Sequence, residues 1–318
     1  MTRTFAFFAA VLLTTVTVTS SCFANSANDL RFKLQPSEVQ GDQVTLQIHS
    51  GRDERHNGMT STFRSSELTG LDVARLNAVG PLGFALVREA GRVDCSGNSN
   101  GRAANGACRF TPDANFNAYL AANGVARPTL DESYGMTLIG VHRDLIGALR
   151  SANYPTPTIE EFIELSAVGV TPAYISDLSR AGYRPHDLDK LVEYRAVGVT
   201  PEYIGAMTRA GYNLPLGEAV EFAALNITPE FIKGFEQIGY RLPQDQLVEF
   251  KALGITPGFI QGFERIGYRN LPSDTLVELK ALDVTPDFVM QVRGSMKSDA
   301  SLDQIVQLKA IGFDKIRR

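Results

Sequence analysis

Apolar and polar residues alternate in two segments near the start of the chain. Every second position there is apolar: Leu30, Phe32 and Leu34, followed by Val44, Leu46 and Ile48. A period of two predicts half-buried strands. Residues 84–88 and 92–95 predict two further strands around a turn at Ala90-Gly91, and residues 66–79 predict a short helix. We expect a compact antiparallel sheet of about five strands.

From residue 111 onward the chain repeats itself. Residues 191–204 and 247–260 share the pattern Leu-Val-Glu-aromatic-basic-Ala-aliphatic-Gly-aliphatic-Thr-Pro. The Thr-Pro pairs begin at positions spaced by 29, 28, 28 and 29 residues: Thr171, Thr200, Thr228, Thr256 and Thr285. Two degenerate copies precede them, at residues 111–125 and 141–154. Such a period predicts stacked supersecondary units.

Each unit predicts two helices, as residues 247–268 illustrate. The first helix has an apolar stripe at helical spacing and ends at Gly254, which suits a left-handed backbone. Thr256 is the expected N-cap of the second helix, with Pro257 at its first position. Gly267 is expected to end that helix, before a tyrosine that packs back on the last turn. One pair cannot bury its own apolar face, so we predict an α+β fold: a small antiparallel β domain followed by an α-solenoid of about six helix pairs.

The first residues are typical of an export signal. Arg3 precedes an apolar run of 14 residues at 5–18, and Cys22 and Ala24 are small residues at the two specificity positions of a signal-peptidase site. Cleavage after Ala24 divides the chain into a signal peptide at 1–24, a β domain at 25–110 and a repeat region at 111–318. The alternative is a lipoprotein, in which Cys22 carries a lipid anchor. No later apolar run is long enough to span a membrane, so we expect a periplasmic or extracellular protein.

The two remaining cysteines predict a disulfide. Cys95 and Cys108 form an even pair in an exported chain, where oxidising conditions favour disulfides. The Gly- and Asn-rich residues 96–107 between them predict a turn or loop, which makes the cysteines cross-strand neighbours in a hairpin. Their spacing, without a histidine nearby, argues against a redox or metal pair.

The composition is that of a globular protein and narrows the function classes. The 318 residues are 44% apolar and 21% charged, and the net charge of −4 gives no bulk attraction to nucleic acid or anionic lipid. The sequence has no HExxH, GxSxG, Walker or CxxC motif. His49 and His56 flank the acidic residues 53–54, a segment that we interpret as a polar loop at 51–58 rather than a metal or acid–base site. We expect a protein without enzymatic activity, metal or cofactor.

Comparing the units within this chain separates fixed from variable positions. One polar position recurs as Glu164, Glu193, Glu221, Glu249 and Glu278, with Gln307 last. Two residues later most units have a basic residue, namely Arg195, Lys251, Lys280 and Lys309, whereas Ser166 and Ala223 interrupt this row. The Glu row is either an acidic binding stripe or a set of side chains that accept backbone N–H bonds or face solvent beside a lysine. The Tyr row, Tyr183, Tyr212, Tyr240 and Tyr268, is likewise either interface or packing.

Two rows of positions on the second helix vary from unit to unit and form the candidate binding surface. The first row is Ser176, Gly205, Lys233, Gln261 and Met290. The second row is Ser179, Thr208, Glu236, Glu264 and Arg293. We expect both rows to face outwards and to contact another protein or a peptide, and not a nucleic acid.

The repeat unit resembles the tandem helical repeats that follow the membrane domain in some bacterial antirepressor metallopeptidases of the β-lactam-sensing type. It also resembles exported repeat proteins of uncharacterised function. The likeness covers roughly residues 111–313, and residues 84–112 are similar to the module that precedes such repeats. This chain lacks the zinc motif and the membrane helices of those peptidases. The resemblance therefore implies an accessory extracytoplasmic module for sensing or protein contact, without peptidase activity.

Three functions are compatible with these features. The first is a non-enzymatic, exported interaction module that binds a protein or peptide through its repeats. The second is an enzyme or inhibitor whose site lies in the β domain, with the repeats as a targeting arm. The third is a lipid-anchored assembly or sensing factor of the envelope.

Overall fold

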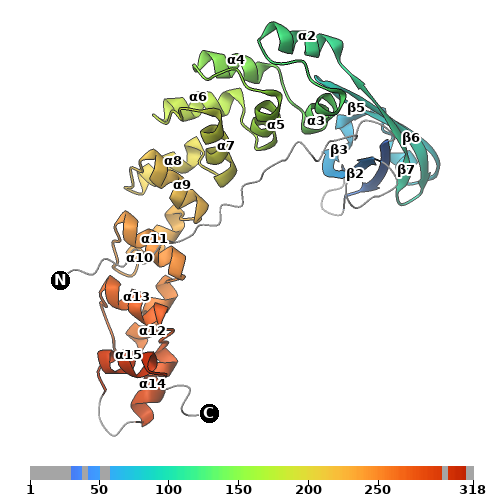
Figure 1. Cartoon of the computed structure of the whole chain (residues 1–318). Coiled ribbons are helices and arrows are strands. Elements are labelled where there is room, and N and C mark those ends of the chain that lie inside the picture. Colours follow the sequence, from blue (N-terminus) through green and yellow to red (C-terminus); the bar gives the residue numbers. More distant parts are fainter. Residues whose placement is uncertain (1–29, 38–41, 51–57, 296–299, 313–318) are drawn as a thin grey trace. The chain divides into compact units, whose positions relative to one another are not determined.

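A computed structural model describes residues 30–37, 42–50, 58–295 and 300–312 of the chain (Figure 1). The predictions that concern Cys22, the cleavage site at Ala24, and His56 with the acidic residues 53–54 lie outside these residues. The described chain divides into two compact units, the first ending at Ala196 and the second starting at Val197.

The first unit begins with an antiparallel sheet of seven strands. They are β1 (Leu30–Pro36), β2 (Gln43–Ser50), β3 (Gly58–Arg64), β4 (Leu68–Thr69), β5 (Val79–Arg88), β6 (Gly91–Asn100) and β7 (Ala104–Pro112), in the order β3-β2-β1-β7-β6-β5-β4. The short helix α1 (Val73–Leu76) falls within the predicted segment 66–79. The prediction of about five strands was too low. Of the two strands that it missed, β3 has a single buried apolar side chain, Phe63, and β4 has only two residues.

The prediction of a loop across residues 96–107 was wrong. Strands β6 and β7 continue through this segment and turn only at residues 101–103. Gly97 lies opposite Gly106, and a Cβ on Gly106 would collide with the carbonyl oxygen of Ser96 and with the ring of Phe32. The glycines at this point therefore permit a close strand pair under an aromatic ring, rather than a turn.

The buried face of the sheet forms one core with helix α3 (Leu130–Ile139). The ring of Phe32 meets that of Phe84 edge to face at 5.0 Å, and Phe110 meets Tyr134 of α3 at 5.4 Å. Cys95 lies directly opposite Cys108 and is bonded to it, as predicted. The disulfide joins β6 to β7 within this core, since Cys95 belongs to it and Cys108 packs against it.

Helices make up the rest of the described chain. The first unit contains α2 (Ala114–Ala122), α3 (Leu130–Ile139), α4 (Asp144–Ser151), α5 (Ile159–Ala167), α6 (Pro172–Arg180) and α7 (Leu188–Val197). Next come α8 (Pro201–Arg209), α9 (Leu216–Ala224), α10 (Pro229–Glu236), α11 (Gln244–Leu253), α12 (Pro257–Arg265), α13 (Ser273–Ala281), α14 (Pro286–Ser295) and α15 (Leu302–Ala310). From α5 to α14, odd numbers mark the first helix of each repeat and even numbers the second.

The helix boundaries follow the predicted caps. The Thr256 hydroxyl accepts a hydrogen bond from the backbone N–H of Phe259 at 3.2 Å, and the other four Thr-Pro units are capped in the same way. Gly254 and Gly267 have φ values of +68° and +98°, as left-handed helix ends require. The degenerate copy at residues 111–125 differs, because Thr111 and Pro112 end strand β7 and Asp113 caps α2 instead.

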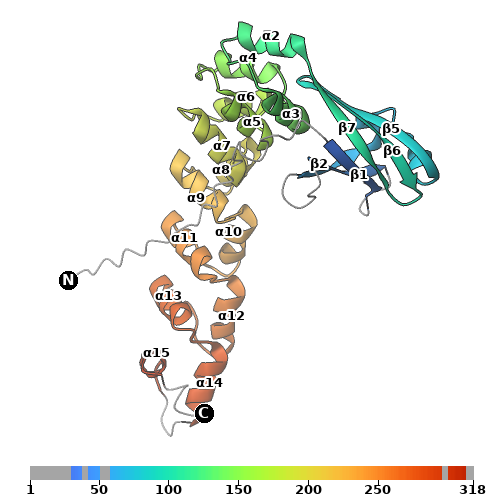
Figure 2. The same ribbon diagram turned by 45° about the vertical axis from the view of Figure 1, so that its right-hand side comes forward.

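Equivalent helices of successive repeats pack on each other within each unit. In the first unit α3 contacts α5 and α4 contacts α6, and in the second unit α11 contacts α13. Figure 2 shows α10, α12 and α14 in one row and α11, α13 and α15 in another. An apolar core runs between these two rows at the end of the second unit. Its buried residues include Phe263, Leu279, Val289, Val292 and Ile305.

Candidate interaction surfaces

The Tyr row serves packing between repeats in the second unit. The hydroxyl of Tyr212 donates a hydrogen bond to the carbonyl of Leu242 at 2.7 Å, and that of Tyr240 donates to the carbonyl of Leu271 at 2.9 Å. Leu242 lies in the link before α11, and Leu271 lies in the link before α13. Each bond therefore spans one complete repeat. These two hydroxyls are thus occupied within the protein and are half-buried.

The basic row has a structural role that the sequence did not reveal. Each of its cations lies over the aromatic ring that follows the preceding Thr-Pro pair. The distances to the ring centroid are 5.4 Å for Arg195 over Tyr174, 4.6 Å for Lys251 over Phe231, 5.2 Å for Lys280 over Phe259 and 4.7 Å for Lys309 over Phe288. Such cation–π contacts join neighbouring repeats. Where Ala223 interrupts the row, the hydroxyl of Tyr203 donates instead to the carbonyl of Ile227 at 2.9 Å.

The Glu row is largely open to solvent. Glu221, Glu249 and Glu278 are exposed, whereas Glu164 and Glu193 are half-buried. The carboxylate of Glu193 accepts a hydrogen bond from the ammonium group of Lys190, three residues earlier on the same helix. This arrangement fits the interpretation of solvent-facing carboxylates beside a lysine.

Glu164 lies in the most acidic part of the row. Burial raises its pKa above the ordinary value, and the negative charges of Asp189, Glu160 and Glu161 add to the shift. Burial and the neighbouring negative charges thus both disfavour the charged form of Glu164.

The first variable row of second helices is exposed in four of its five positions. Ser176, Lys233, Gln261 and Met290 are exposed, and Gly205 is half-buried. Half of the Met290 surface is accessible, so its thioether side chain is available for contact. The chemistry along this row changes from hydroxyl to ammonium, amide and thioether.

The second variable row is only partly free for contacts. Thr208 and Glu236 are exposed, whereas Ser179, Glu264 and Arg293 are half-buried. The hydroxyl of Thr208 donates to the carbonyl of Ile204 at 3.0 Å, and the guanidinium of Arg293 lies 4.9 Å from the ring centroid of Tyr268. The first row is therefore the better candidate for partner contact.

An open groove of about 720 Å³ lies between the first helices of two successive repeats, α9 and α11. Its lining includes the carboxylates Glu218, Glu221 and Asp245 and the apolar side chains of Phe222 and Val248. None of the residues that line it is a lysine or arginine. The sequence analysis did not identify this groove.

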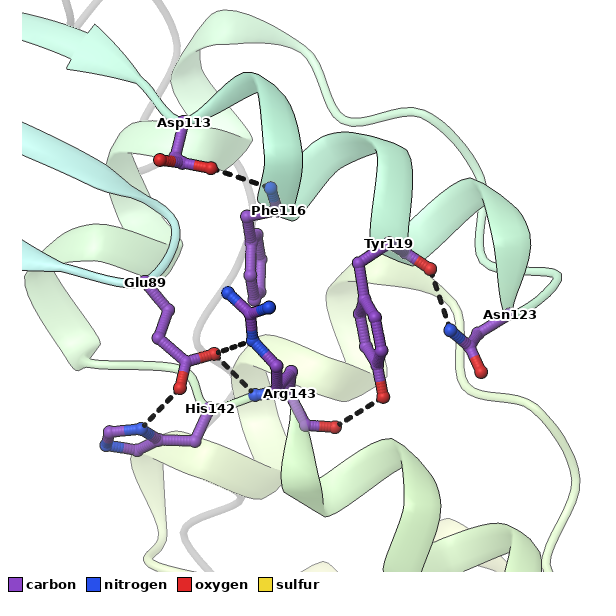
Figure 3. A network of polar contacts seen from close by, with 7 residues as sticks. All are labelled: Glu89, Asp113, Phe116, Tyr119, Asn123, His142 and Arg143. Carbon is purple, nitrogen blue, oxygen red and sulfur yellow. Dashed lines mark hydrogen bonds and ion pairs between the residues drawn. The ribbon is translucent and has the colours of Figure 1, made fainter.

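A polar network joins the sheet to the helices in the first unit (Figure 3). Glu89, in the turn between β5 and β6, accepts hydrogen bonds from the backbone N–H of Arg143 at 3.0 Å and from its Nε at 2.8 Å. The Nδ1 atom of His142 lies 3.5 Å from the same carboxylate. Burial raises the pKa of Glu89, but the hydrogen bonds from Arg143 and His142 outweigh it, so the pKa lies below its ordinary value. The guanidinium also lies 5.9 Å from the ring of Phe116 and 5.4 Å from that of Tyr119.

A shallow hollow lies at strands β4 to β6 of the sheet. This hollow of about 310 Å³ is lined by residues of β5 and β6, including Gly83, Arg92, Asp94 and Ser96. Its carboxylate, Asp94, is already paired with Nε of Arg92 at 2.7 Å. His49 lies on β2 and does not line the hollow. No pair of histidines or carboxylates converges in it.

Neither a metal-ligand cluster nor a helix that could span a membrane occurs among the described residues. Among them, no group of three or more His, Cys, Asp and Glu side chains lies close enough to hold a metal ion. In the same part of the chain, no helix combines the length and apolar character of a membrane span. Comparisons with protein-family models, with curated proteins and with solved structures found no match to this chain.

Proposed function

We propose that this protein is a non-enzymatic, exported interaction module whose helix pairs stack into an α-solenoid that binds another protein or a peptide. The contacts between α3 and α5, α4 and α6, and α11 and α13 support stacking of equivalent helices. The disulfide between Cys95 and Cys108 supports an oxidising compartment. The resemblance to extracytoplasmic repeat modules points the same way.

One observation carries the binding function. The Thr caps, the hydroxyls of Tyr212 and Tyr240 and the cations of the basic row are engaged within the repeats, whereas the Glu row is largely open to solvent. The side chains that differ between repeats, such as Lys233, Gln261 and Met290, face outwards. Repeat proteins commonly combine a fixed internal framework with a variable surface that recognises a partner.

Site-specific photo-crosslinking in the native envelope tests this proposal. A photoreactive phenylalanine analogue is placed singly at Lys233, Gln261 and Met290, and at the exposed sheet positions Val79 and Val87 as matched controls. We expect one discrete adduct from the helix positions and none from the sheet positions. Adducts formed only from the sheet positions would move the function to the β domain and reduce the repeats to a scaffold.

A further inference from the structure

Helix α9 lacks the basic residues that α7 and α11 contain. Its Glu218 stands where α7 has Lys190 and α11 has Gln246, and its Ala223 stands where α7 and α11 have a basic residue. The nine residues of α9 therefore contain two carboxylates and no cation. Glu218 and Glu221 lie three residues apart on the same helix, so like charges are neighbours. Helix α5 has Glu161 and Ser166 at the positions of Glu218 and Ala223, but there the Glu161 carboxylate accepts a hydrogen bond from the backbone N–H of Thr158 at 2.7 Å.

A sister repeat shows what the Glu row binds when a cation is present. In α7 the ammonium group of Lys190 is bonded to the carboxylate of Glu193. Glu193 and Glu221 occupy the same repeat position, as do Lys190 and Glu218. In α9 the chain thus replaces the cation by a second acceptor, and the pair has no ammonium group of its own on that helix.

The groove between α9 and α11 lies over this pair. One carboxylate oxygen of Glu218, Oε2, is inaccessible to water and has no hydrogen-bond partner among the described residues. A shielded, unpaired carboxylate oxygen is costly unless a cation or a hydrogen-bond donor reaches it. Asp245 adds a third carboxylate from α11, and Arg241, in the link before α11, is exposed and does not line the groove.

We propose that this groove binds a lysine side chain of an extended, basic segment of a partner protein. The Glu218 side chain turns its shielded oxygen toward the groove, and the ammonium group pairs with Glu218 and Glu221, as Lys190 pairs with Glu193 within α7. The apolar stem of the lysine lies against Phe222 and Val248, which line the same groove. The volume of about 720 Å³ leaves room for the backbone on either side of that residue.

This site is formed by first helices and differs from the variable rows on second helices. If the groove does not bind lysine, the crosslinking expected at Lys233 and Gln261 is unaffected. If no crosslink forms at those positions, lysine binding in the groove is unaffected. The two proposals therefore stand or fall by separate measurements.

The test is the binding of a fluorescent peptide, acetyl-Gly-Lys-Gly-Lys-Gly amide, to the purified chain, followed by anisotropy at low salt. A peptide with glutamine in place of both lysines is the reference. We expect the lysine peptide to bind at least about tenfold more tightly than the reference, and Glu218→Gln to weaken its binding by at least about tenfold. Glu218→Lys, which rebuilds the pairing of α7 inside the groove, is expected to abolish binding.

Glu278→Gln is the matched control, since Glu278 holds the same row position on α13 and does not line the groove. This variant is expected to bind the lysine peptide with an affinity within about twofold of that of the unmodified chain. Circular dichroism melts show that each variant is folded. Equal affinity for the two peptides, unchanged affinity in both Glu218 variants, or an equal loss in Glu278→Gln would each overturn the proposal.

Discussion

The phenolic hydroxyl of Tyr240 donates a hydrogen bond to the backbone carbonyl of Leu271, 2.9 Å away. This bond ties the end of α10 to the link before α13, 31 residues further along the chain. Tyr212 makes the same bond with Leu242 one repeat earlier. In these two repeats the position uses the hydroxyl as well as the aromatic ring, which favours tyrosine over phenylalanine there.

Replacing Tyr240 by Phe is expected to lower the free energy of unfolding by about 1 kcal/mol, because it removes the donor and leaves the Leu271 carbonyl without it. Tyr268→Phe is the matched control. The Tyr268 hydroxyl is buried and has no hydrogen-bond partner among the residues that the structure describes. Its loss should be neutral or slightly stabilising, and the difference is measured by urea denaturation. Equal effects of the two substitutions would show that the hydroxyl bond does not stabilise the repeat.

A glycine inside helix α12 marks the contact between two second helices. A Cβ on Gly262 would lie 2.9 Å from Cγ of Pro286, the first residue of α14, whereas a Cβ on Gly147 of α4 would meet no atom within 4 Å. Alanine is favoured over glycine in a helix by about 1 kcal/mol. We therefore expect Gly147→Ala to stabilise the protein by up to about that amount and Gly262→Ala to destabilise it. Thermal melts of both variants, compared with the unmodified chain, measure the two signs; stabilisation by Gly262→Ala would mean that the two helices separate at no cost.

The repeats were predictable because their signals are local. Thr256, Pro257 and Gly254 determine helix ends through contacts within a few residues, and the structure has the predicted caps at each Thr-Pro unit. Two strands were missed because their local signals are weak. Edge strand β3 has Thr60, Ser61 and Thr62 in its middle, so apolar and polar residues do not alternate there, and β4 has only two residues.

The parts of the candidate sites that depend on distant residues were not predictable from one sequence. Glycines at 97 and 106 suggested a loop, because close pairing between strands is visible only once the register is known. The network of Glu89 and Arg143 joins segments 54 residues apart without a shared motif. For the groove, one signal did exist: α9 contains no basic residue, unlike α7, α11 and α13.

The disulfide between Cys95 and Cys108 is expected to stabilise the first unit. It closes a loop between residues 13 positions apart, for which the chain-entropy model gives about 3 kcal/mol. Denaturation of the chain with and without a thiol reductant, followed by the fluorescence of tyrosine or by circular dichroism, measures this difference. A Cys95→Ala, Cys108→Ala double variant should lose stability in the absence of reductant and show no further response to it. A response of the variant to reductant would assign the effect to another cause.

The carboxylate of Glu89 predicts a loss of stability in acid. Its pKa is lower in the folded protein than its ordinary value, so its contribution is present above the unfolded pKa, about 4.3, and disappears as the pH falls through the folded pKa. The side chain is 31% exposed, which limits the expected contribution to less than about 1 kcal/mol. Glu89→Gln should therefore lower the melting temperature at pH 7. The difference in melting temperature between the variant and the unmodified chain should be smaller near pH 3.

A double-mutant cycle isolates the pair that causes this dependence. Arg143→Gln removes the Nε donor but keeps the backbone N–H that also bonds Glu89. The coupling free energy between Glu89→Gln and Arg143→Gln should be favourable at pH 7, where the carboxylate is charged, and should be smaller near pH 3, as the carboxylate takes up a proton. A coupling of equal size at both pH values would mean that the sheet and α4 are joined by packing around Phe116 and Tyr119, because the cation–π contacts of Arg143 do not depend on the charge of Glu89.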